Sequence, residues 1–284
     1  MMNINFNSDD EDNPIHAALK KFLIDCQVQD LKEAGKTEEA EQLALKNVEQ
    51  DLSAIEQEQL ASGSNDENYT PDTVPEQCVS KTFDNYADNF DQHLTKQLNY
   101  AVPLIIQEMV SKFTEGRFKR LLDLGCGTGL CTEVIGDLVL HKTGVDLSEG
   151  MLEKADQKSL YDDLYLNDLT EFLQNDWDER WDLIISGDTF IYLGALEEAV
   201  AGLAKNIELN GKVIFTTETA ADEAFSEKPY VMSNRGRFAH SAVYLRKVLA
   251  DNDFTLIELD EITPRFEDGK PVLGLVVVAQ YNGK

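Results

Sequence analysis

The feature that most constrains the fold of this chain is a short apolar run that leads directly into a glycine-rich loop. Leu121–Leu124 is followed by Gly125-Cys126-Gly127-Thr128-Gly129, and a helical pattern begins near Leu130. Glycine is needed where the backbone turns sharply and comes close to a ligand, because it has no Cβ to obstruct the approach. Together, the strand, loop and helix predict an α/β sheet with a ligand site beside the loop.

Apolar runs and helical stretches alternate from residue 118 onward. The expected strands are Arg120–Leu124, Thr143–Leu147, Leu164–Leu166, Leu183–Ser186 and Lys212–Thr217. The expected helices begin near Leu130, Glu149, Thr170 and Ala195. This alternation of strands and helices predicts a doubly wound, mainly parallel sheet.

The last part of the chain departs from this alternation. Thr255–Leu259 and Val272–Gln280 are apolar runs that flank Asp268-Gly269, a dipeptide typical of hairpin turns. The sheet is therefore expected to finish with an antiparallel hairpin.

Residues 1–60 show two helical patterns. Pro14 opens the first, Gly35-Lys36 interrupts it, and Thr37 can cap the second, which predicts an N-terminal helical hairpin. The sequence around Gly35 resembles half of a tetratricopeptide repeat, but no second copy follows, and about three repeats are needed to close a solenoid core. An accessory hairpin, or one that forms a homodimer, is favoured over a peptide-binding solenoid.

A linker and a helical segment precede the strands. Residues 61–77 are polar and contain two prolines, which predicts a flexible linker and leaves 78–284 as one domain. Residues 80–115 are expected to be helical. One apolar stripe is formed by Phe83, Tyr86, Ala87, Phe90 and Leu94. Pro103 suits the first turn of a further helix that runs towards Phe113.

Net charge limits the kinds of partner. The 284 residues include 53 acidic and 25 basic side chains, a formal charge of −28. Such a charge repels phosphate backbones and anionic lipid surfaces, so neither nucleic acid nor membrane is an expected partner. The acidic start lacks the features of a secretory signal, and no apolar run reaches the roughly 20 residues that cross a bilayer. A cytoplasmic location is expected.

Cysteine usage supports this interpretation. Cys26, Cys78, Cys126 and Cys131 form no CxxC motif and no repeated spacing. They are typical of ordinary thiols in a reducing compartment, so neither a disulfide framework nor a metal site is predicted.

A carboxylate follows the second expected strand. Asp146 stands 19 residues after Gly127, a placement from which an acid accepts both ribose hydroxyls of an adenosine. The loop spacing is GxGxG, whereas the dinucleotide fingerprint GxGxxG requires a glycine where Leu130 stands. The loop and the acid therefore favour a nucleoside cofactor over a dinucleotide.

In order and spacing, these segments resemble the class I S-adenosylmethionine-dependent methyltransferases. Leu121–Leu130 is similar to the first motif of that family, Gly144–Leu152 to its ribose-binding segment and Asn167-Asp168-Leu169 to its adenine-contact turn. Trp181–Tyr192 is similar to the fourth motif. The resemblance covers roughly residues 80–281. It implies a Rossmann-like, seven-stranded sheet, with S-adenosyl-L-methionine as cofactor and S-adenosyl-L-homocysteine as product.

A nearer likeness is to methyltransferases assigned to small molecules, some of which carry tetratricopeptide repeats. It rests on Phe83–Asp91, Phe190–Leu193, Arg237–Ser241 and Tyr244-Leu245. This likeness implies a small-molecule acceptor.

The resemblance also implies roles for the residues of the glycine loop. The backbone around Gly125, Cys126, Gly127 and Gly129 would hold the methionine part of the cofactor. Asp123, just before the loop, would help to orient the ammonium group.

The nucleoside part of the cofactor would contact a second set of residues. Asp146, followed by Leu147, would bind the ribose, and Met151 would pack against the adenine. Asp168 would accept a hydrogen bond from the adenine amino group, with the Leu169 N–H beside it. Plain core packing is the alternative for Met151, and capping of the following helix is the alternative for Asp168.

Tyr86 and Phe90 are expected to close over the cofactor as a helical lid. The alternative is that their stripe only docks on the sheet, and the two interpretations are compatible.

Methyl transfer can require a base for the acceptor's proton. Asp188, His240 and Tyr192 lie on segments expected at the carboxyl end of the sheet, and each is a candidate catalytic residue. The alternative for His240 is a structural role at the start of the helix that begins at Ser241.

Two arginines before that helix are candidates for binding the acceptor. Arg235 and Arg237 could pair with an acidic acceptor. The alternative is a pair of surface salt bridges with Glu227 or Asp222.

The fourth motif limits the acceptor further. Ser186-Gly187-Asp188-Thr189 replaces the Asn-Pro-Pro-Tyr motif that serves amide or nucleobase N-methylation, and so disfavours those substrates. Leu130 and the lack of a hydride-transfer constellation disfavour a nicotinamide oxidoreductase. A non-catalytic or regulatory protein that binds the cofactor, and uses its N-terminal helices on a protein partner, stays open as an alternative.

Overall fold

The computed structural model describes residues 73–74, 76–88, 90–96, 98–114, 116–226, 228–233, 236–267 and 269–283. The hairpin predicted over 1–60, and all but the end of the linker predicted over 61–77, lie outside the described residues. The backbone N of Val74 donates to Tyr192 O at 2.9 Å, and helix α3 begins at Glu76. The described structure therefore includes residues slightly before the domain boundary predicted at residue 78.

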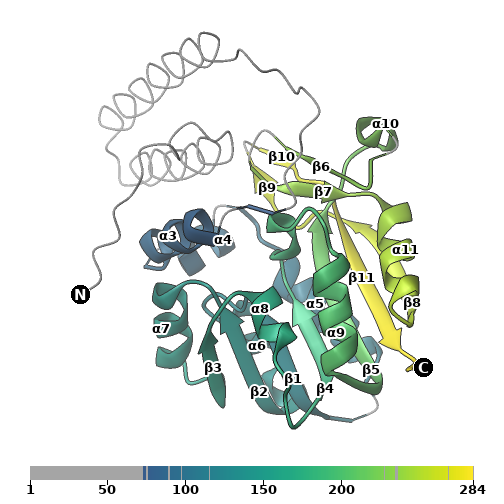
Figure 1. Ribbon diagram of the computed structural model, residues 1–284. Coiled ribbons are helices and arrows are strands. Elements are labelled where there is room, and N and C mark those ends of the chain that lie inside the picture. The colour runs from purple at the N-terminus through teal and green to yellow at the C-terminus, as the bar shows by residue number, and fades with distance from the viewer. Residues whose placement is uncertain are drawn as a thin grey trace, which may run out of the picture. The chain divides into compact units, whose positions relative to one another are not determined.

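In the described part of the chain, the main sheet follows the strand order β3-β2-β1-β4-β5-β11-β8 (Figure 1). Its strands are β1 Phe118–Leu124, β2 Val139–Asp146, β3 Asp163–Leu166, β4 Trp181–Ser186, β5 Ile207–Glu218, β8 Phe254–Ile262 and β11 Gly274–Tyr281. Strands β1 to β5 pair in parallel. Each predicted strand overlaps an observed one, which confirms the mainly parallel, doubly wound sheet.

Strand β11 lies between β5 and β8 and is antiparallel to both, so that Val277 pairs with Phe215 on one side and Leu259 on the other. The predicted antiparallel pair is therefore confirmed. The turn at Gly269 belongs to a separate small ribbon formed by β9 Phe266–Glu267 and β10 Lys270–Pro271.

A further pair of short strands was not predicted from the sequence. Strands β6 Tyr230–Met232 and β7 Phe238–His240 pair with each other, and β7 also pairs with the end of β5. Only three residues long, these strands give too weak a periodic signal to stand out in the sequence.

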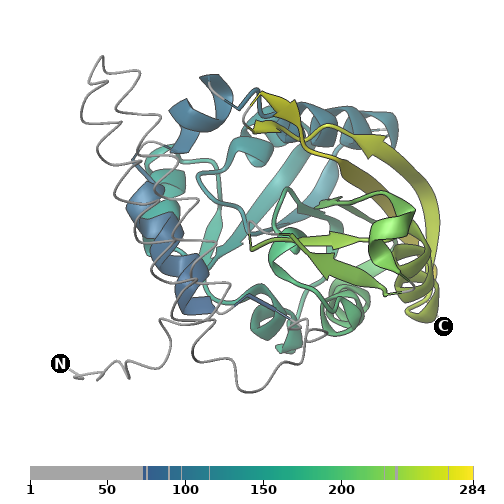
Figure 2. The same cartoon turned by 90° about the horizontal axis from the view of Figure 1, so that it is seen from above.

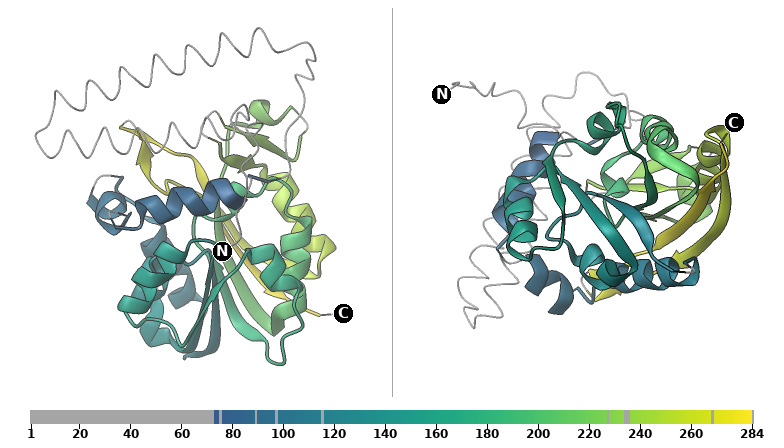
Figure 3. Two further views of the ribbon diagram at one scale, coloured as in Figure 1. Left: turned by 60° about the vertical axis from the view of Figure 1, so that its left-hand side comes forward. Right: turned by 90° about the horizontal axis from the view of Figure 1, so that it is seen from below.

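Helices cover both faces of the sheet, as Figure 3 shows. They are α5 Val102–Lys112, α6 Leu130–Ile135, α7 Glu149–Gln157, α8 Leu169–Gln174, α9 Glu197–Asn206 and α11 Ala242–Asp251, with single 3-10 turns at Gly136–Leu138 and Phe190–Tyr192. The short helix α10 Asp222–Phe225 lies beside β6. Neighbouring residues of a strand point to opposite faces. Leu122 and Leu124 therefore enter the core that contains α8, α9 and α11 residues, whereas Leu121 enters the core with α5 and α6. None of the described helices is long and apolar enough to span a membrane.

The helical segment before the sheet differs from the single stripe predicted over residues 83–94. Helix α3 ends at Tyr86, a turn follows at Ala87-Asp88, and α4 runs over Phe90–Lys96. Asp88 pairs with Lys154 at 2.6 Å, and aspartate favours turns because its side chain competes for backbone hydrogen bonds. Both helices lie near the ends towards which the β1 and β2 arrows point (Figures 1 and 2).

Candidate active site

The glycine loop leaves β1 in a conformation that other residues rarely adopt. Gly125, Gly127 and Gly129 have φ angles of 66°, 54° and 88°. A Cβ on Gly125 would lie 2.2 Å from Thr189 Oγ1, so the loop and the end of β4 approach each other more closely than a side chain allows. Cys126, between these glycines, is buried. The loop lies at the carboxyl edge of the sheet, where α/β folds bind ligands, with Gly125 and Gly127 half-buried.

Asp146 ends β2 and contacts the loop directly. Its Oδ2 accepts a hydrogen bond from Gly127 N at 2.7 Å, and its Oδ1 accepts one from Ser148 N at 2.9 Å. Burial raises the pKa of this carboxyl to about 6. A carboxylate offers about four acceptor positions, so two remain for the hydroxyls of a ribose. The geometry of Asp146 fits the predicted ribose contact.

Asp123 lies beneath the loop and is almost completely buried. Its Oδ2 accepts hydrogen bonds from Thr132 Oγ1 and Tyr161 OH, both at 2.7 Å. Burial raises its pKa to about 6, although the two hydroxyl donors oppose that shift. These two contacts hold the end of β1 against α6 and the segment before β3, and a contact between Asp123 and the cofactor's ammonium group stays a prediction. Sequence reasoning missed Thr132 and Tyr161, because neither has a motif signal.

Of the residues predicted around the adenine, Asp168 has a structural role of its own, and Met151 and Leu169 are buried. Asp168 caps α8, since its Oδ1 accepts from Thr170 N at 2.7 Å and from Glu171 N at 3.0 Å. Leu147 is half-buried. The capping role, weighed as the alternative for Asp168, is thus present, and adenine contacts by Asp168 and Met151 stay predictions.

Helices α3 and α4 are tied to the same edge of the sheet. Asp84 Oδ1 accepts from Ser148 Oγ at 2.6 Å and from Gly150 N at 3.1 Å, and Asp91 accepts from Thr128 Oγ1. The Tyr86 and Phe90 rings meet edge to face, with centroids 5.3 Å apart. A Cβ on Gly127 would lie 3.7 Å from the Phe90 ring. Phe90 therefore lies over the glycine loop, as a lid residue must.

His240 is placed in a way that argues against the predicted role of general base. Its side chain is fully buried, its Nδ1 lies 2.6 Å from Thr217 Oγ1, and its Nε2 lies 3.0 Å from Gly194 O. A carbonyl oxygen can only accept, so Nε2 carries the proton and Thr217 donates to Nδ1. Because both nitrogens are engaged, the ring has no lone pair for a substrate proton. His240 instead joins β7, β5 and the segment before α9.

Burial also lowers the pKa of His240 to about 4, from 6.5 in an unfolded chain. Such a histidine binds its proton more readily when the chain is unfolded, so its contribution to stability is complete above pH 6.5 and is lost as the pH falls towards 4. We expect the stability advantage of the wild type over His240→Gln to shrink by about 2 kcal/mol between pH 7 and pH 5. Urea unfolding at both pH values measures this difference, in which the opposite contributions of Asp123 and Asp146 cancel. A constant advantage would contradict the assignment.

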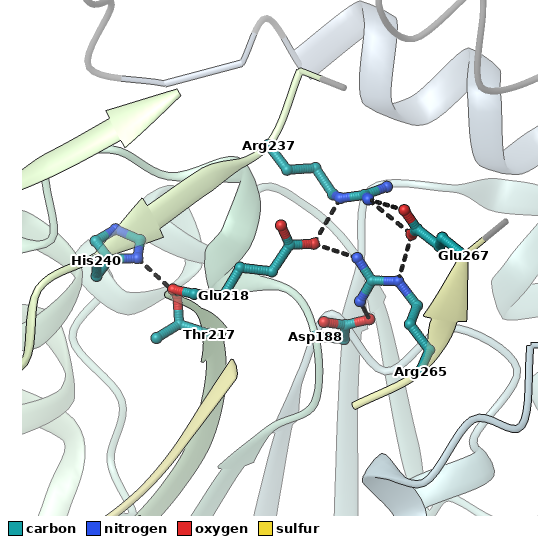
Figure 4. A network of polar contacts seen from close by, with 7 residues as sticks. All are labelled: Asp188, Thr217, Glu218, Arg237, His240, Arg265 and Glu267. Carbon is teal, nitrogen blue, oxygen red and sulfur yellow. Dashed lines mark hydrogen bonds and ion pairs between the residues drawn. The ribbon is translucent and has the colours of Figure 1, made fainter. Parts of the chain in front are cut away.

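A cluster of charged residues lies beside β5 and β7, and we call Asp188, Glu218, Arg237, Arg265 and Glu267 the ionic cluster (Figure 4). Asp188 is half-buried, and the other four residues are buried. Arg237 Nε donates to Glu218 at 2.7 Å, and its Nη2 donates to Glu267 at 2.7 and 2.9 Å. Arg265 donates to Glu267 at 2.7 Å, to Asp188 at 2.5 Å, and also to Glu218. Burial disfavours the charged form of Arg265, but the adjacent Asp188 and Glu218 outweigh it and raise its pKa.

The ionic cluster corrects one expectation from the sequence. Arg237 is buried and bound to Glu218 and Glu267, whereas surface pairing with Asp222 or Glu227 was the alternative weighed. Arg235 lies outside the described residues. Arg265, Glu218 and Glu267 were not singled out, because their partners are distant in the sequence.

Of the other two predicted catalytic residues, Asp188 belongs to the ionic cluster and Tyr192 lies close to its charges. Asp188 has a left-handed backbone, with φ 59°, and its N donates to Thr216 Oγ1 at 2.8 Å. Tyr192 is affected by the charges of Asp188 and Arg237, but burial dominates and raises its pKa to about 12. The Tyr192 hydroxyl is therefore protonated at neutral pH, and a catalytic role for Tyr192 stays a prediction.

Comparison with known proteins decides the family. Residues 94–259 match a family described as "Methyltransferase domain". That match covers more than half of the chain. The chain belongs to this methyltransferase family. The predicted S-adenosylmethionine-dependent methyltransferase class, with S-adenosylmethionine as its cofactor, is thereby confirmed.

Individual relatives of this methyltransferase are also named as methyltransferases. It is 29% identical over 195 residues to a malonyl-[acyl-carrier protein] O-methyltransferase of Priestia megaterium, a match that covers 66% of this chain and 67% of that protein. It is 31% identical over 156 residues to a protein of the same name from Anoxybacillus flavithermus, covering 54% of this chain and 57% of the relative. Other matches cover 55% and 49% of the relatives, so the chain spans between half and two thirds of the length of these curated relatives.

Solved structures share the fold of this methyltransferase. The magnesium protoporphyrin IX methyltransferase of Synechocystis PCC 6803, solved with bound S-adenosylhomocysteine, has a TM-score of 0.56 at 17% identity, covering 73% of this chain and 100% of that one. The N-methyltransferase NodS of Bradyrhizobium japonicum, also in complex with S-adenosylhomocysteine, has a TM-score of 0.56 at 16% identity, covering 72% and 98%. At these identities the likeness supports the fold alone.

Proposed function

We propose that this protein transfers the methyl group of S-adenosylmethionine to a small-molecule acceptor bound at the carboxyl edge of the sheet. The observation that carries the proposal is the contact between the Asp146 carboxylate and the Gly127 amide, at 2.7 Å. This contact supports the proposal because it holds a carboxylate, which can accept hydrogen bonds from ribose hydroxyls, beside the glycine loop.

Each residue of the site has a proposed task. The loop backbone at Gly125, Gly127 and Gly129 binds the methionine part, and Asp146 binds the ribose. Phe90 covers the loop, and the pairing of Asp84 with Ser148 and Gly150 holds this cover in place. Met151 and Asp168 are proposed to contact the adenine.

Methyl transfer requires the protein mainly to align the acceptor with the cofactor. The bound cofactor supplies a methyl group that is already activated by a positively charged sulfur. The chain has to place the acceptor's nucleophile in line with the carbon–sulfur bond and to exclude water. The tethered helices α3 and α4, and the buried end of β4, are proposed to do this.

The acceptor itself is proposed only by class. The relatives are named for malonyl-[acyl-carrier protein], and that name makes an acyl carrier protein one acceptor to be tried. The proposal for this chain is a small molecule, in keeping with the nearer likeness noted in the sequence.

A thermal-shift experiment tests the cofactor half of this proposal without knowledge of the acceptor. S-adenosylhomocysteine keeps the groups that Asp146 and the glycine loop are proposed to bind, and at 100 times its Kd a ligand stabilises the folded state by about 2.7 kcal/mol. For a domain of this size each kcal/mol raises the Tm by roughly 2–4 °C. We therefore expect a rise of about 5–11 °C. NAD at the same concentration is the control and is expected to give almost none. An equal or larger shift with NAD would overturn the proposal.

A further inference from the structure

Asp188 lies where the glycine loop meets the ionic cluster. The next residue, Thr189, donates from Oγ1 to Gly125 O at 3.3 Å, and Ser186 Oγ donates to Leu124 O at 2.9 Å. The backbone of Asp188 is fixed by Thr216, and its Oδ2 is held by Arg265 at 2.5 Å. The carboxylate is therefore fixed beside the loop proposed to hold the methionine end of the cofactor.

The second oxygen of this carboxylate is left without a partner. Asp188 Oδ1 is buried and accepts no hydrogen bond from any residue that the structure describes. A buried carboxylate oxygen without a donor is unfavourable, and buried polar atoms in native proteins are nearly always satisfied. The unsatisfied oxygen points to a hydrogen-bond donor supplied by a bound molecule.

The charges around Asp188 restrict which molecule this can be. Each of the three nitrogens of the Arg265 guanidinium already donates to a carboxylate, namely Asp188, Glu218 or Glu267. With all groups ionised, the ionic cluster sets three carboxylates against two guanidinium groups and carries one negative charge in excess. A ligand carboxylate beside Asp188 would be repelled by this negative charge, whereas an amine or a hydroxyl of the ligand can donate a hydrogen bond to Asp188 Oδ1.

We propose that Asp188 Oδ1 binds the acceptor, and that the acceptor presents an amine or a hydroxyl and not a carboxylate. This inference rests on the proposed methyl transfer. Arg265 is then a positioning residue that fixes the direction of the carboxylate.

The transfer step conserves electrons and charge with these groups. An amine acceptor reacts in its uncharged form, after its ammonium proton has been released to water. The lone pair of the acceptor nitrogen or oxygen then forms the new bond to the methyl carbon, and the carbon–sulfur bond breaks with its electron pair left on sulfur. Positive charge thus moves from sulfur to the acceptor atom, where the Asp188 carboxylate stabilises it. The proton that the acceptor atom then loses is released to water as the product leaves.

Three fragments that share one ring test the preference directly. Benzylamine, benzyl alcohol and benzoate are titrated against the full chain saturated with S-adenosylhomocysteine, and binding is followed by ligand-observed NMR. We expect benzylamine to bind at least about tenfold more tightly than benzoate, with benzyl alcohol between them. Benzoate binding as tightly as benzylamine, or no measurable binding of benzylamine, would overturn the inference.

A matched variant assigns the effect to Asp188. Asp188→Asn keeps the shape and tolerates the left-handed backbone but loses the charge, so we expect it to lose the tenfold preference for benzylamine while S-adenosylhomocysteine affinity stays within about threefold. Asp176→Asn, whose side chain is 95% exposed, is the control and should change neither. Equal loss of S-adenosylhomocysteine affinity in Asp188→Asn would place this carboxylate in the cofactor site and overturn the inference.

A labelled-methyl assay separates this inference from the proposed function. The full chain is incubated with methyl-labelled S-adenosylmethionine and malonyl-[acyl-carrier protein], the acceptor named for the relatives. We expect no label on its free carboxylate. Labelling there would support methyl transfer and overturn the amine or hydroxyl acceptor. Failure of S-adenosylhomocysteine to bind the wild type would instead overturn the proposed function.

Discussion

Replacing Asp146 with alanine is expected to lower the affinity for S-adenosylhomocysteine by at least about two orders of magnitude. The substitution removes two proposed hydrogen bonds from ribose hydroxyls to a charged acceptor, each worth roughly 1.5–3 kcal/mol. It also frees the Gly127 and Ser148 amides that the carboxylate now orients. Calorimetric titration of the purified full chain measures the change.

Two further variants sharpen this test. Asp146→Asn keeps the size of the side chain and one acceptor oxygen, so its affinity is expected to fall between those of Asp146→Ala and the wild type. Asp176→Ala removes an exposed carboxylate that pairs with Lys205 and should bind as the wild type does. Wild-type affinity in Asp146→Ala would show that the ribose is bound elsewhere.

Replacing Arg265 with methionine is expected to destabilise the fold by about 3–5 kcal/mol, the usual cost of breaking a buried ion pair from one side. The reason is that Asp188, Glu218 and Glu267 would lose their shared donor while remaining largely buried, with Arg237 as the remaining guanidinium of the ionic cluster. At roughly 2–4 °C per kcal/mol, the Tm should fall by about 6–20 °C. Urea and thermal unfolding at neutral pH measure both quantities.

An exposed arginine provides the matched control. Arg246 lies on α11 with its side chain exposed, and Arg246→Met is expected to change stability by less than about 1 kcal/mol. Should Arg265→Met unfold at the same urea concentration as Arg246→Met, the ionic cluster would not contribute to stability in the way its geometry indicates.

The parts of the fold that sequence predicted correctly depend on local pattern. A strand residue alternates between faces and a helix residue recurs with a 3.6-residue period, so Leu121–Leu124 and the start of α7 at Glu149 can be read from neighbours alone. The glycine loop is equally local, since the positive φ angles at Gly125, Gly127 and Gly129 require glycine within five residues.

Where local reasoning failed, a competing contact from a distant segment decided the outcome. The stripe predicted over residues 83–94 breaks after Tyr86, where Asp88 pairs with Lys154 from α7. For His240 the sequence leaves a catalytic and a structural role open, and the contacts of both ring nitrogens with Thr217 and Gly194 favour the structural one.

Local patterns in the sequence predicted the sheet class, the glycine loop, the acid at the end of β2 and, through their order and spacing, the methyltransferase family. Which charges lie together depends on contacts that form only in the folded chain. Arg265 meets Asp188 across 77 residues and Glu218 across 47, and the cost of burying any one of these charges depends on the presence of the others. No short stretch of the sequence contains all of these residues, because they come together only when the ends of β4 and β5 and the segment before β9 meet in the folded chain.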